Sequence, residues 1–308
     1  MNSLQDALDD YLSTRRSVGF KLRETEHMLR DYVAYLDRRE ATTTTTDLAL
    51  TWAKQPINVA PHRWHQRLTA VRGFAKYLHA LDAAAEVPPA NLLVAQRART
   101  APYIYSELDV AALLAGAATL APPFRADTYR TLLGLLAVTG MRVGEAIRLD
   151  CQDVNWTDGL LTIRASKFNR SREVVLHPTT VDALRSYQRL CRKRPRVSTP
   201  AFFLSAHGTR LIYADLWRTY RSLVRGAGLE KKTSSQRRPR LHDLRHTFAV
   251  NTIINWYRDG LDAGDRLYLL STYLGHIDPK GTYWYLSGIP ELLELAGARL
   301  ERTLGDLP

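Results

Sequence analysis

Cysteine is scarce in this sequence, with only Cys151 and Cys191 among 308 residues. Two cysteines exclude a disulfide-stapled scaffold, and their scarcity favours a reducing compartment, so we expect a cytoplasmic protein. No apolar run approaches the roughly 18–20 residues that cross a bilayer, so no membrane association is predicted. The N-terminal stretch is acidic and amphipathic, and it lacks the basic start and apolar core of a secretory signal.

Glycine-rich nucleotide-binding motifs are also missing. The sequence contains no G-x-x-x-x-G-K-[ST] and no G-x-G-x-x-G, so the use of ATP or a dinucleotide is not predicted. His242 and His246 have the spacing of a zinc-binding H-E-x-x-H helix, but Asp243 replaces the glutamate and Arg245 would bring positive charge beside a metal. We therefore expect neither a cofactor nor a metal site.

Positive charge is what the sequence has in excess. Lysine and arginine number 43 against 31 aspartates and glutamates, which gives a formal net charge of +12. Such an excess favours a polyanionic partner such as nucleic acid. Apolar residues make up 45% and charged residues 24%, a composition typical of globular proteins, and the length suggests two domains.

Helical periodicity dominates the first 82 residues. Ser3 starts one apolar pattern with a capping box, and Pro61 starts a longer one that reaches Leu81. Asp47 is predicted to cap a short helix between them. The proline-containing stretch that follows is the best linker candidate. We predict a helical N-terminal domain over 1–90, a linker over 91–105 and a second domain over 106–308.

The second domain is predicted to be mainly helical with one small antiparallel sheet. A helix near 125–138 should end at Gly140, and a short one should begin near Val143. Two β-rich runs, 160–164 and 173–176, flank a polar basic connection and predict a hairpin. Residues 201–204 are expected to form a further short strand.

Four short segments carry residues with chemical potential. An arginine stands between two predicted helices in TGMRVGE, a lysine lies on the hairpin tip, HDLRHTF contains H-x-x-R, and LGH is followed nine residues later by a tyrosine. Each segment alone is weak, since a lone arginine or lysine is usually only solvated. The residues concerned are Arg142, Glu145, Lys167, His242, Arg245, His276 and Tyr285.

Taken in this order, the segments resemble the tyrosine recombinase (phage integrase) family. The resemblance covers residues 106–290 by motif and the first 82 by helical pattern only. It implies a helical core-binding domain followed by a mixed α/β catalytic domain. It also implies a site-specific recombinase that cuts and rejoins double-stranded DNA through a 3′-phosphotyrosyl intermediate, and a homotetramer on paired sites, alone or with related recombinases. A mobile-element integrase or transposase is favoured over chromosome-dimer resolution.

The resemblance implies a role for each residue of the set. Tyr285 is the nucleophile, Glu145 is a supporting residue, and the guanidinium groups of Arg142 and Arg245 bind the non-bridging phosphate oxygens. Lys167 is a plausible general acid for the leaving 5′-oxygen. His242 and His276 add hydrogen bonds, so the chemistry requires no metal.

Several alternatives remain open from the sequence. Tyr283 and Tyr273 compete with Tyr285 as nucleophile, although packing is their ordinary role. A non-catalytic DNA-binding relative is disfavoured by the complete residue set. A type IB topoisomerase would share the pocket, but the separate helical domain and short C-terminal tail favour a recombinase. The amphipathic tail over 288–304 could pack on its own domain or on a neighbouring protomer.

Two basic sets are predicted to contact DNA phosphates, against the simpler interpretation that their charges are only solvated. One set lies on the helix that begins at Pro61, and the other precedes the H-x-x-R segment. They comprise Arg63, Arg67, Arg72 and Lys76 in the first set, and Lys231, Lys232, Arg237, Arg238 and Arg240 in the second.

Overall fold

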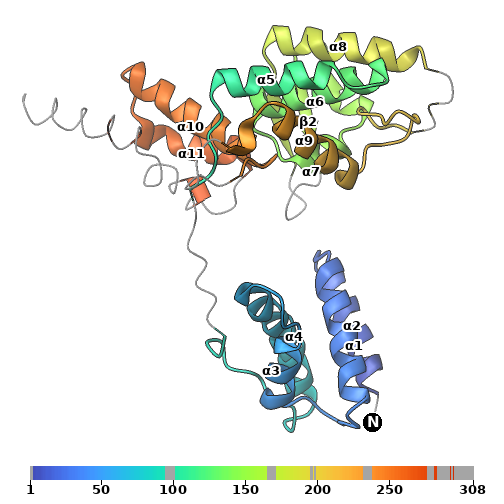
Figure 1. Ribbon diagram of the computed structural model, residues 1–308. Coiled ribbons are helices and arrows are strands. Elements are labelled where there is room, and N and C mark those ends of the chain that lie inside the picture. The colour runs from blue at the N-terminus through green and yellow to red at the C-terminus, as the bar shows by residue number, and fades with distance from the viewer. Residues whose placement is uncertain are drawn as a thin grey trace, which may run out of the picture. The chain divides into compact units, whose positions relative to one another are not determined.

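The chain divides into two compact units, residues 1–99 and 100–308 (Figure 1). Within them, the computed structural model describes residues 3–93, 101–164, 171–194, 197, 199–231, 238–275, 281–282, 292 and 294. The fold is mainly α-helical with one small antiparallel sheet, as the sequence predicts. Across the described part of the chain, no helix combines the length and apolar character that crossing a membrane requires.

The first unit is a small helical bundle. A capping box joins Ser3 and Asp6 at the start of its first helix, as predicted. Its core contains the fully buried rings of Tyr32, Trp52 and Phe74. The described residues of this unit form the helices α1 (Leu4–Ser17), α2 (Arg23–Asp37), α3 (Thr46–Lys54) and α4 (Pro61–Leu81).

The start of α3 differs from the prediction that Asp47 caps it. Thr45 is the cap, because its backbone is extended (φ −118°, ψ 160°) and its Oγ1 accepts the N–H of Leu48 at 3.2 Å. Asp47 instead lies in the first turn. A run of threonines supplies capping hydroxyls as well as aspartate does, so helix periodicity alone could not select the cap.

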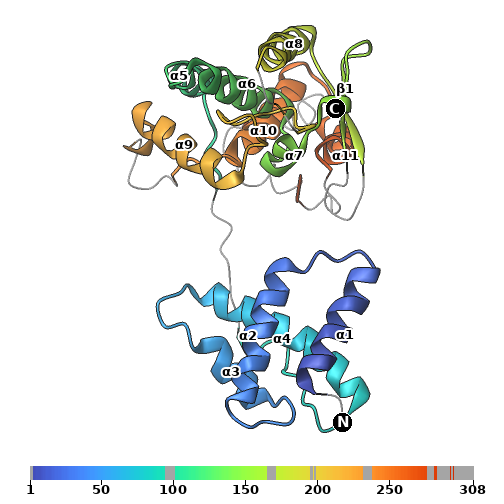
Figure 2. The same cartoon turned by 90° about the vertical axis from the view of Figure 1, so that its right-hand side faces the viewer.

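The second unit holds seven helices and a three-stranded sheet within its described residues (Figures 1 and 2). The helices are α5 (Glu107–Ala118), α6 (Pro123–Thr139), α7 (Val143–Arg148), α8 (Pro178–Arg192), α9 (Tyr213–Gly226), α10 (Asp243–Arg258) and α11 (Ala263–Leu274). The strands are β1 (Val154–Asn155), β2 (Leu160–Ile163) and β3 (Arg172–Val175), and two 3₁₀ turns cover Cys151–Asp153 and Leu229–Lys231.

The predicted hairpin is present. β2 and β3 pair antiparallel, with Leu160 opposite Val175 and Ile163 opposite Arg172. The predicted strand over 201–204 is wrong, because these residues pair only through isolated bridges, Asp150 with Ala201 and Leu204 with Arg210. All four side chains of 201–204 are buried, which explains the apolar pattern that predicted a strand. No other strand pairs continuously with this segment, so it does not become one itself.

The segment that enters the second unit is tied to α10. Tyr103 and Tyr105, inside the range predicted as linker, are buried in the core of the second unit. The backbone N–H of Tyr105 donates to Thr247 Oγ1 at 2.9 Å, and its hydroxyl contacts that of Tyr220 on α9. The chain is therefore anchored to the second unit before α5 begins.

A left-handed glycine joins α6 to α7. Gly140 caps α6 with φ +59°, which lets the chain turn directly into the short α7. A Cβ on Gly140 would lie 2.5 Å from Cδ1 of Phe248 on α10, so both the backbone and the packing require glycine here.

We therefore expect Gly140→Ala to lower the free energy of unfolding by roughly 1–3 kcal/mol, the cost of a non-glycine residue in this backbone region. Gly134→Ala is the matched control, because Gly134 lies inside α6 and its added methyl would meet no described atom within 4 Å. That variant should be stabilised by about 0.5–1 kcal/mol. Urea unfolding followed by circular dichroism measures both, and equal changes in the two variants would contradict the requirement for glycine at position 140.

Candidate active site

The candidate site is built around the buried carboxylate of Glu145. Its Oε2 accepts the backbone N–H of Arg142 at 2.8 Å, which caps the start of α7. Its Oε1 accepts Nη1 of Arg142 at 2.8 Å and Nη1 of Arg172 at 3.0 Å, and Oε2 also accepts Nη2 of Arg172 at 2.8 Å. The side chain is 1% exposed. Both carboxylate oxygens are therefore held by charged donors.

This environment keeps Glu145 ionised. Burial by itself would raise the pKa of the carboxyl group, but the hydrogen bonds and positive charge of Arg172, together with the backbone and side-chain hydrogen bonds from Arg142, outweigh burial and lower the pKa to about 2. Glu145 therefore carries a full negative charge at neutral pH. That charge balances one of the two guanidinium groups and leaves the cluster positive.

Three arginines hold the end of α11. Arg172 Nε donates to the carbonyl of Tyr273 at 2.7 Å. The next two carbonyls, of Leu274 and Gly275, accept Arg245 Nη2 at 2.6 Å and Arg142 Nη2 at 2.8 Å. Carbonyls in the last turn of a helix lack intrahelical partners and carry partial negative charge, so guanidinium groups stabilise them. The following residue in the chain is His276.

Arg245 also joins this end of α11 to the glycine junction. Its Nη1 donates to the carbonyl of Gly140 at 2.9 Å, and the residue is 2% exposed. The N-terminus of α10, the C-terminus of α6 and the C-terminus of α11 therefore meet at one guanidinium group. The structure thus brings together Arg142, Glu145 and Arg245 of the predicted set.

His242 lies at the N-terminal cap of α10, beside these arginines. Partial loss of solvation, followed by the positive charges of Arg245, Arg240 and Arg142, lowers the pKa of His242 to about 4, and the residue is nevertheless exposed at the surface. Its ring packs edge-to-face on His246 at 4.8 Å between centroids. His242 is therefore a neutral imidazole at pH 7, able to donate or accept a hydrogen bond.

A groove of about 490 Å³ runs up to His242. Arg240 lines it and forms an ion pair with the fully buried Asp243 at 2.9 Å. Two exposed aromatic residues of α9, Tyr213 and Trp217, line it as well, along with Arg238. Aromatic faces beside cationic groups suit a polyanionic partner with exposed rings or sugars.

Other predicted residues fall outside the described part of the chain. Lys231 ends a 3₁₀ turn, but its side chain is not among the described ones. Tyr273, one alternative nucleophile, stacks on Phe248 at 5.6 Å, and burial raises the pKa of its hydroxyl, so it serves as a packing residue. Of the tail over 288–304 only two residues are described, and one of them, Leu292, is buried in a core cluster with residues of α10 and α11. The other predicted residues outside the described part of the chain are Lys167, Lys232, Arg237, His276, Tyr283 and Tyr285.

The basic residues of α4 have different surroundings from one another. Arg67 lies 3.6 Å over the Trp52 ring and donates to the Trp52 carbonyl, and Arg72 donates to the carbonyls of Pro88, Pro89 and Ala90. Arg63 pairs with Glu24, whereas the side chain of Lys76 is exposed. Three of these four cations are therefore engaged inside the first unit.

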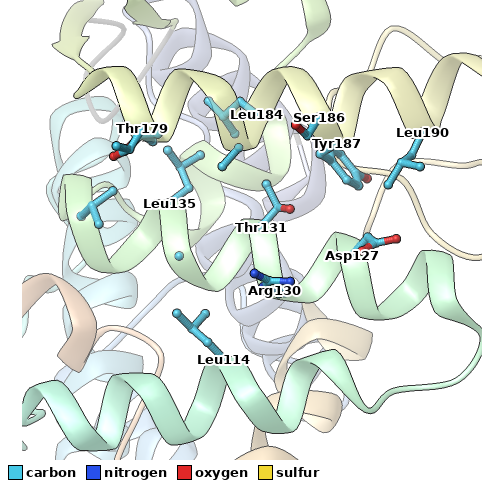
Figure 3. Close-up of a pocket in the computed structure, with 14 residues that line it drawn as sticks. Leu114, Asp127, Arg130, Thr131, Leu135, Thr179, Leu184, Ser186, Tyr187 and Leu190 are labelled. Carbon is cyan, nitrogen blue, oxygen red and sulfur yellow. The ribbon is translucent and has the colours of Figure 1, made fainter.

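A second cavity, of about 440 Å³, lies between α6 and its two neighbours α5 and α8 (Figure 3). Leu114, Leu135 and Leu184 point into it, and Asp127 and Arg130 of α6 also line it. None of its described lining residues belongs to the predicted set. This cavity therefore shares no lining residue with the arginine cluster around Glu145.

Arg172 is the residue that sequence reasoning missed. It contacts both Glu145 and the end of α11, yet in the sequence it is one of several basic residues around the hairpin, with Arg164 and Arg170 nearby. The available signal was its position as the first residue of β3, opposite Ile163. Spacing alone does not say that this strand end faces Glu145.

Comparison with known proteins gives one consistent result. The model of the phage integrase family matches residues 108–288. The putative integrase/recombinase y4rB of Sinorhizobium fredii is 42% identical over 313 residues, which cover 99% of this chain and 99% of that protein. The chain is therefore similar to that relative along its whole length.

Solved structures show a similar fold at low identity. The Tn1549 transposon integrase in complex with transposon right end DNA has a TM-score of 0.65 at 13% identity, covering 96% of this chain and 98% of that one. A λ integrase tetramer bound to a Holliday junction has a TM-score of 0.61 at 17% identity, covering 91% and 79%.

We expect Glu145→Gln to lower the free energy of unfolding at pH 7 by about 3 kcal/mol, because two guanidinium groups lose their counter-charge. The pKa of this carboxyl is about 2 in the folded protein against an ordinary 4.5, so its contribution is complete above pH 4.5 and is lost as pH falls toward 2. The difference between wild type and variant should therefore shrink over that interval.

Urea unfolding at several pH values between 7 and 3 measures this difference. Glu173→Gln is the matched control, since Glu173 lies on β3 next to Arg172 and is exposed. It should change stability by less than about 0.5 kcal/mol. A pH-independent gap for Glu145→Gln would show that its charge is not what stabilises the cluster.

Proposed function

This chain belongs to the phage integrase family, and we propose that it is a site-specific DNA recombinase that cuts and rejoins strands through a 3′-phosphotyrosyl intermediate. One observation carries the proposal. Arg142 and Arg245 converge at the end of α11, with His242 close enough to both arginines to feel their charge, and that end leads directly into His276 and, nine residues on, Tyr285. Residues from separate motifs of the family thus lie in one cluster, and their side chains are of the kinds that bind phosphate.

The two arginines would stabilise the phosphate during transfer. Arg142 donates Nη1 and Nη2 to protein acceptors, and its side chain is 26% exposed, so its remaining N–H groups can reach a phosphate oxygen. Arg245 brings a second guanidinium group whose orientation is set by two backbone carbonyls. Donors fixed in advance stabilise the pentacovalent phosphorus more than the starting diester.

The proton transfers are assigned to residues of the predicted set. The Tyr285 hydroxyl would give its proton to solvent water and attack phosphorus as the phenolate, the P–O5′ bond would break, and the Lys167 ammonium group would give a proton to the leaving 5′-oxygen and regain one from solvent. His242, neutral at pH 7, would donate a hydrogen bond to a non-bridging oxygen, and His276 would do the same. Attack by a 5′-hydroxyl on the phosphotyrosine reverses these steps and restores the tyrosine.

Double-stranded DNA is the proposed partner. The net charge of +12 and the groove of Trp217, Arg238 and His242 support it. We further propose a homotetramer on paired sites, alone or with related recombinases, as in the λ integrase tetramer. The similarity to a transposon integrase supports a role in moving a mobile element, and the scarce cysteines support a cytoplasmic protein.

Substitution of Tyr285 tests the proposal. In a duplex nicked close to the cleavage site, the short fragment that carries the new 5′-hydroxyl diffuses away after cleavage. The reverse reaction then cannot occur, so the covalent intermediate is trapped. A randomised pool of such duplexes supplies the unknown site. Wild type should form an adduct with the 3′ end that survives denaturation. Tyr285→Phe should bind the selected duplex but form no adduct, because it lacks the nucleophilic oxygen.

Tyr283→Phe is the matched control and should trap DNA like wild type. The nucleophile is misassigned if Tyr283→Phe abolishes the adduct and Tyr285→Phe keeps it. Absence of any adduct from wild type across the whole pool would contradict the proposed reaction itself.

The surroundings of α4 predict which of its cations contacts DNA. The exposed Lys76 should bind phosphate, so Lys76→Ala should flatten the log–log dependence of affinity on salt by about 0.9 and leave thermal stability unchanged. Arg72→Ala should lower the melting temperature, because three carbonyls lose their donor. Salt titrations with a random duplex measure the effect of Lys76→Ala, and thermal melts measure the effect of Arg72→Ala. An unchanged salt dependence for Lys76→Ala would show that the charge of Lys76 is only solvated.

A further inference from the structure

Arg172 connects parts of the site that are distant in the sequence. It begins β3, and its guanidinium group contacts Glu145 on α7 and the carbonyl of Tyr273 on α11. We propose that Arg172 is a positioning residue for strand transfer, which holds the Arg142–Glu145 pair and the end of α11 in one fixed arrangement. The proposal rests on the proposed function, since it concerns the rate of the same reaction.

The geometry requires an arginine. Nη1 and Nη2 bind the two oxygens of Glu145 at 3.0 and 2.8 Å, and Nε binds the Tyr273 carbonyl at 2.7 Å. A planar guanidinium group offers these donors in a rigid fork. Lysine carries a single ammonium group on a flexible stem, so it would keep the charge and lose the link between the two partners.

The hydrogen bonds of Arg172 indicate that it acts through its neighbours. Its Nε, Nη1 and Nη2 each donate to a protein acceptor, and its side chain is 11% exposed. Arg142 shares Glu145 with it and also binds the carbonyl two residues beyond Tyr273. Loss of Arg172 would therefore release both the carboxylate that orients Arg142 and the helix end that precedes His276.

A close approach supports the same assignment. Gly275 has φ +68°, and a Cβ on it would lie 3.0 Å from Nη1 and 3.3 Å from Cζ of Arg172. The last residue of the turn is therefore packed directly on the guanidinium group. A small displacement of either partner would be transmitted to the other, because buried groups in contact move together.

Arg172→Lys is the first test. Single-turnover covalent capture with the selected nicked duplex should slow by about 10- to 100-fold, while the affinity for that duplex stays within about twofold, because misplacement affects the reaction and not binding. Arg210→Lys is the matched control. Arg210 also joins backbone carbonyls, of Ile147 and Leu149, to a carboxylate, that of Asp150, but at the far end of α7. It should capture DNA at the wild-type rate.

Gly275→Ala is a second test that leaves Arg172 in the chain. Its methyl should push against the guanidinium group and slow capture in the same way, with affinity preserved. Gly260→Ala is its control, since Gly260 has φ +71° but its added methyl would meet no described atom within 4 Å. Both variants place alanine in the same left-handed backbone region, and of the two only Gly275→Ala brings its methyl group against Arg172.

Three results would overturn the proposal. Capture by Arg172→Lys at the wild-type rate would show that the fork is dispensable. Equal slowing in Arg172→Lys and Arg210→Lys, or in both glycine variants, would reduce the effect to general stability. A parallel loss of affinity and rate in Arg172→Lys would make it a DNA-binding residue. A wild type that captures no DNA refutes the proposed function instead, and so is distinguished from these.

Discussion

The interaction on which the site depends joins three successive carbonyls at the end of α11 to three guanidinium groups. A helix that ends inside a protein must satisfy its last carbonyls, and here Arg172, Arg245 and Arg142 bind three of them in succession. Three neighbouring cations repel one another, and the buried Glu145 reduces this repulsion by binding two of them. Helix end, carboxylate and arginines therefore stabilise each other, and none keeps its position alone.

The fold supplies these groups from four separate places. α7 brings Arg142 and Glu145, the sheet brings Arg172, α10 brings Arg245, and α11 brings the carbonyls. The left-handed Gly140 lets α6 turn directly into α7 and gives Arg245 a second carbonyl. A rigid convergence of this kind suits a reaction on phosphorus, whose transition state gains charge that fixed donors can meet without reorganising.

Much of this arrangement could be predicted from local patterns. Three predicted features are present and follow from short-range rules: the end of α6 at Gly140, the capping box at Ser3 and the β2–β3 hairpin. What could not be predicted depends on contacts distant in sequence. Nothing near Arg72 shows that Pro88 to Ala90 return to it, and nothing near Arg172 shows that its strand end faces Glu145. Residues 201–204 mislead for the same reason, because a strand needs a neighbour that the segment itself does not encode.

The attachment of Tyr105 has a mechanical consequence. Before α5 begins, the Tyr103 hydroxyl donates to Asp109 of α5 at 2.9 Å, and the backbone N–H of Tyr105 donates to Thr247 of α10, two residues after Arg245. These tyrosines therefore tie α5 to the helix whose first turn carries Arg245. A displacement of this short segment would reach Arg245 through one hydrogen bond and two residues of helix.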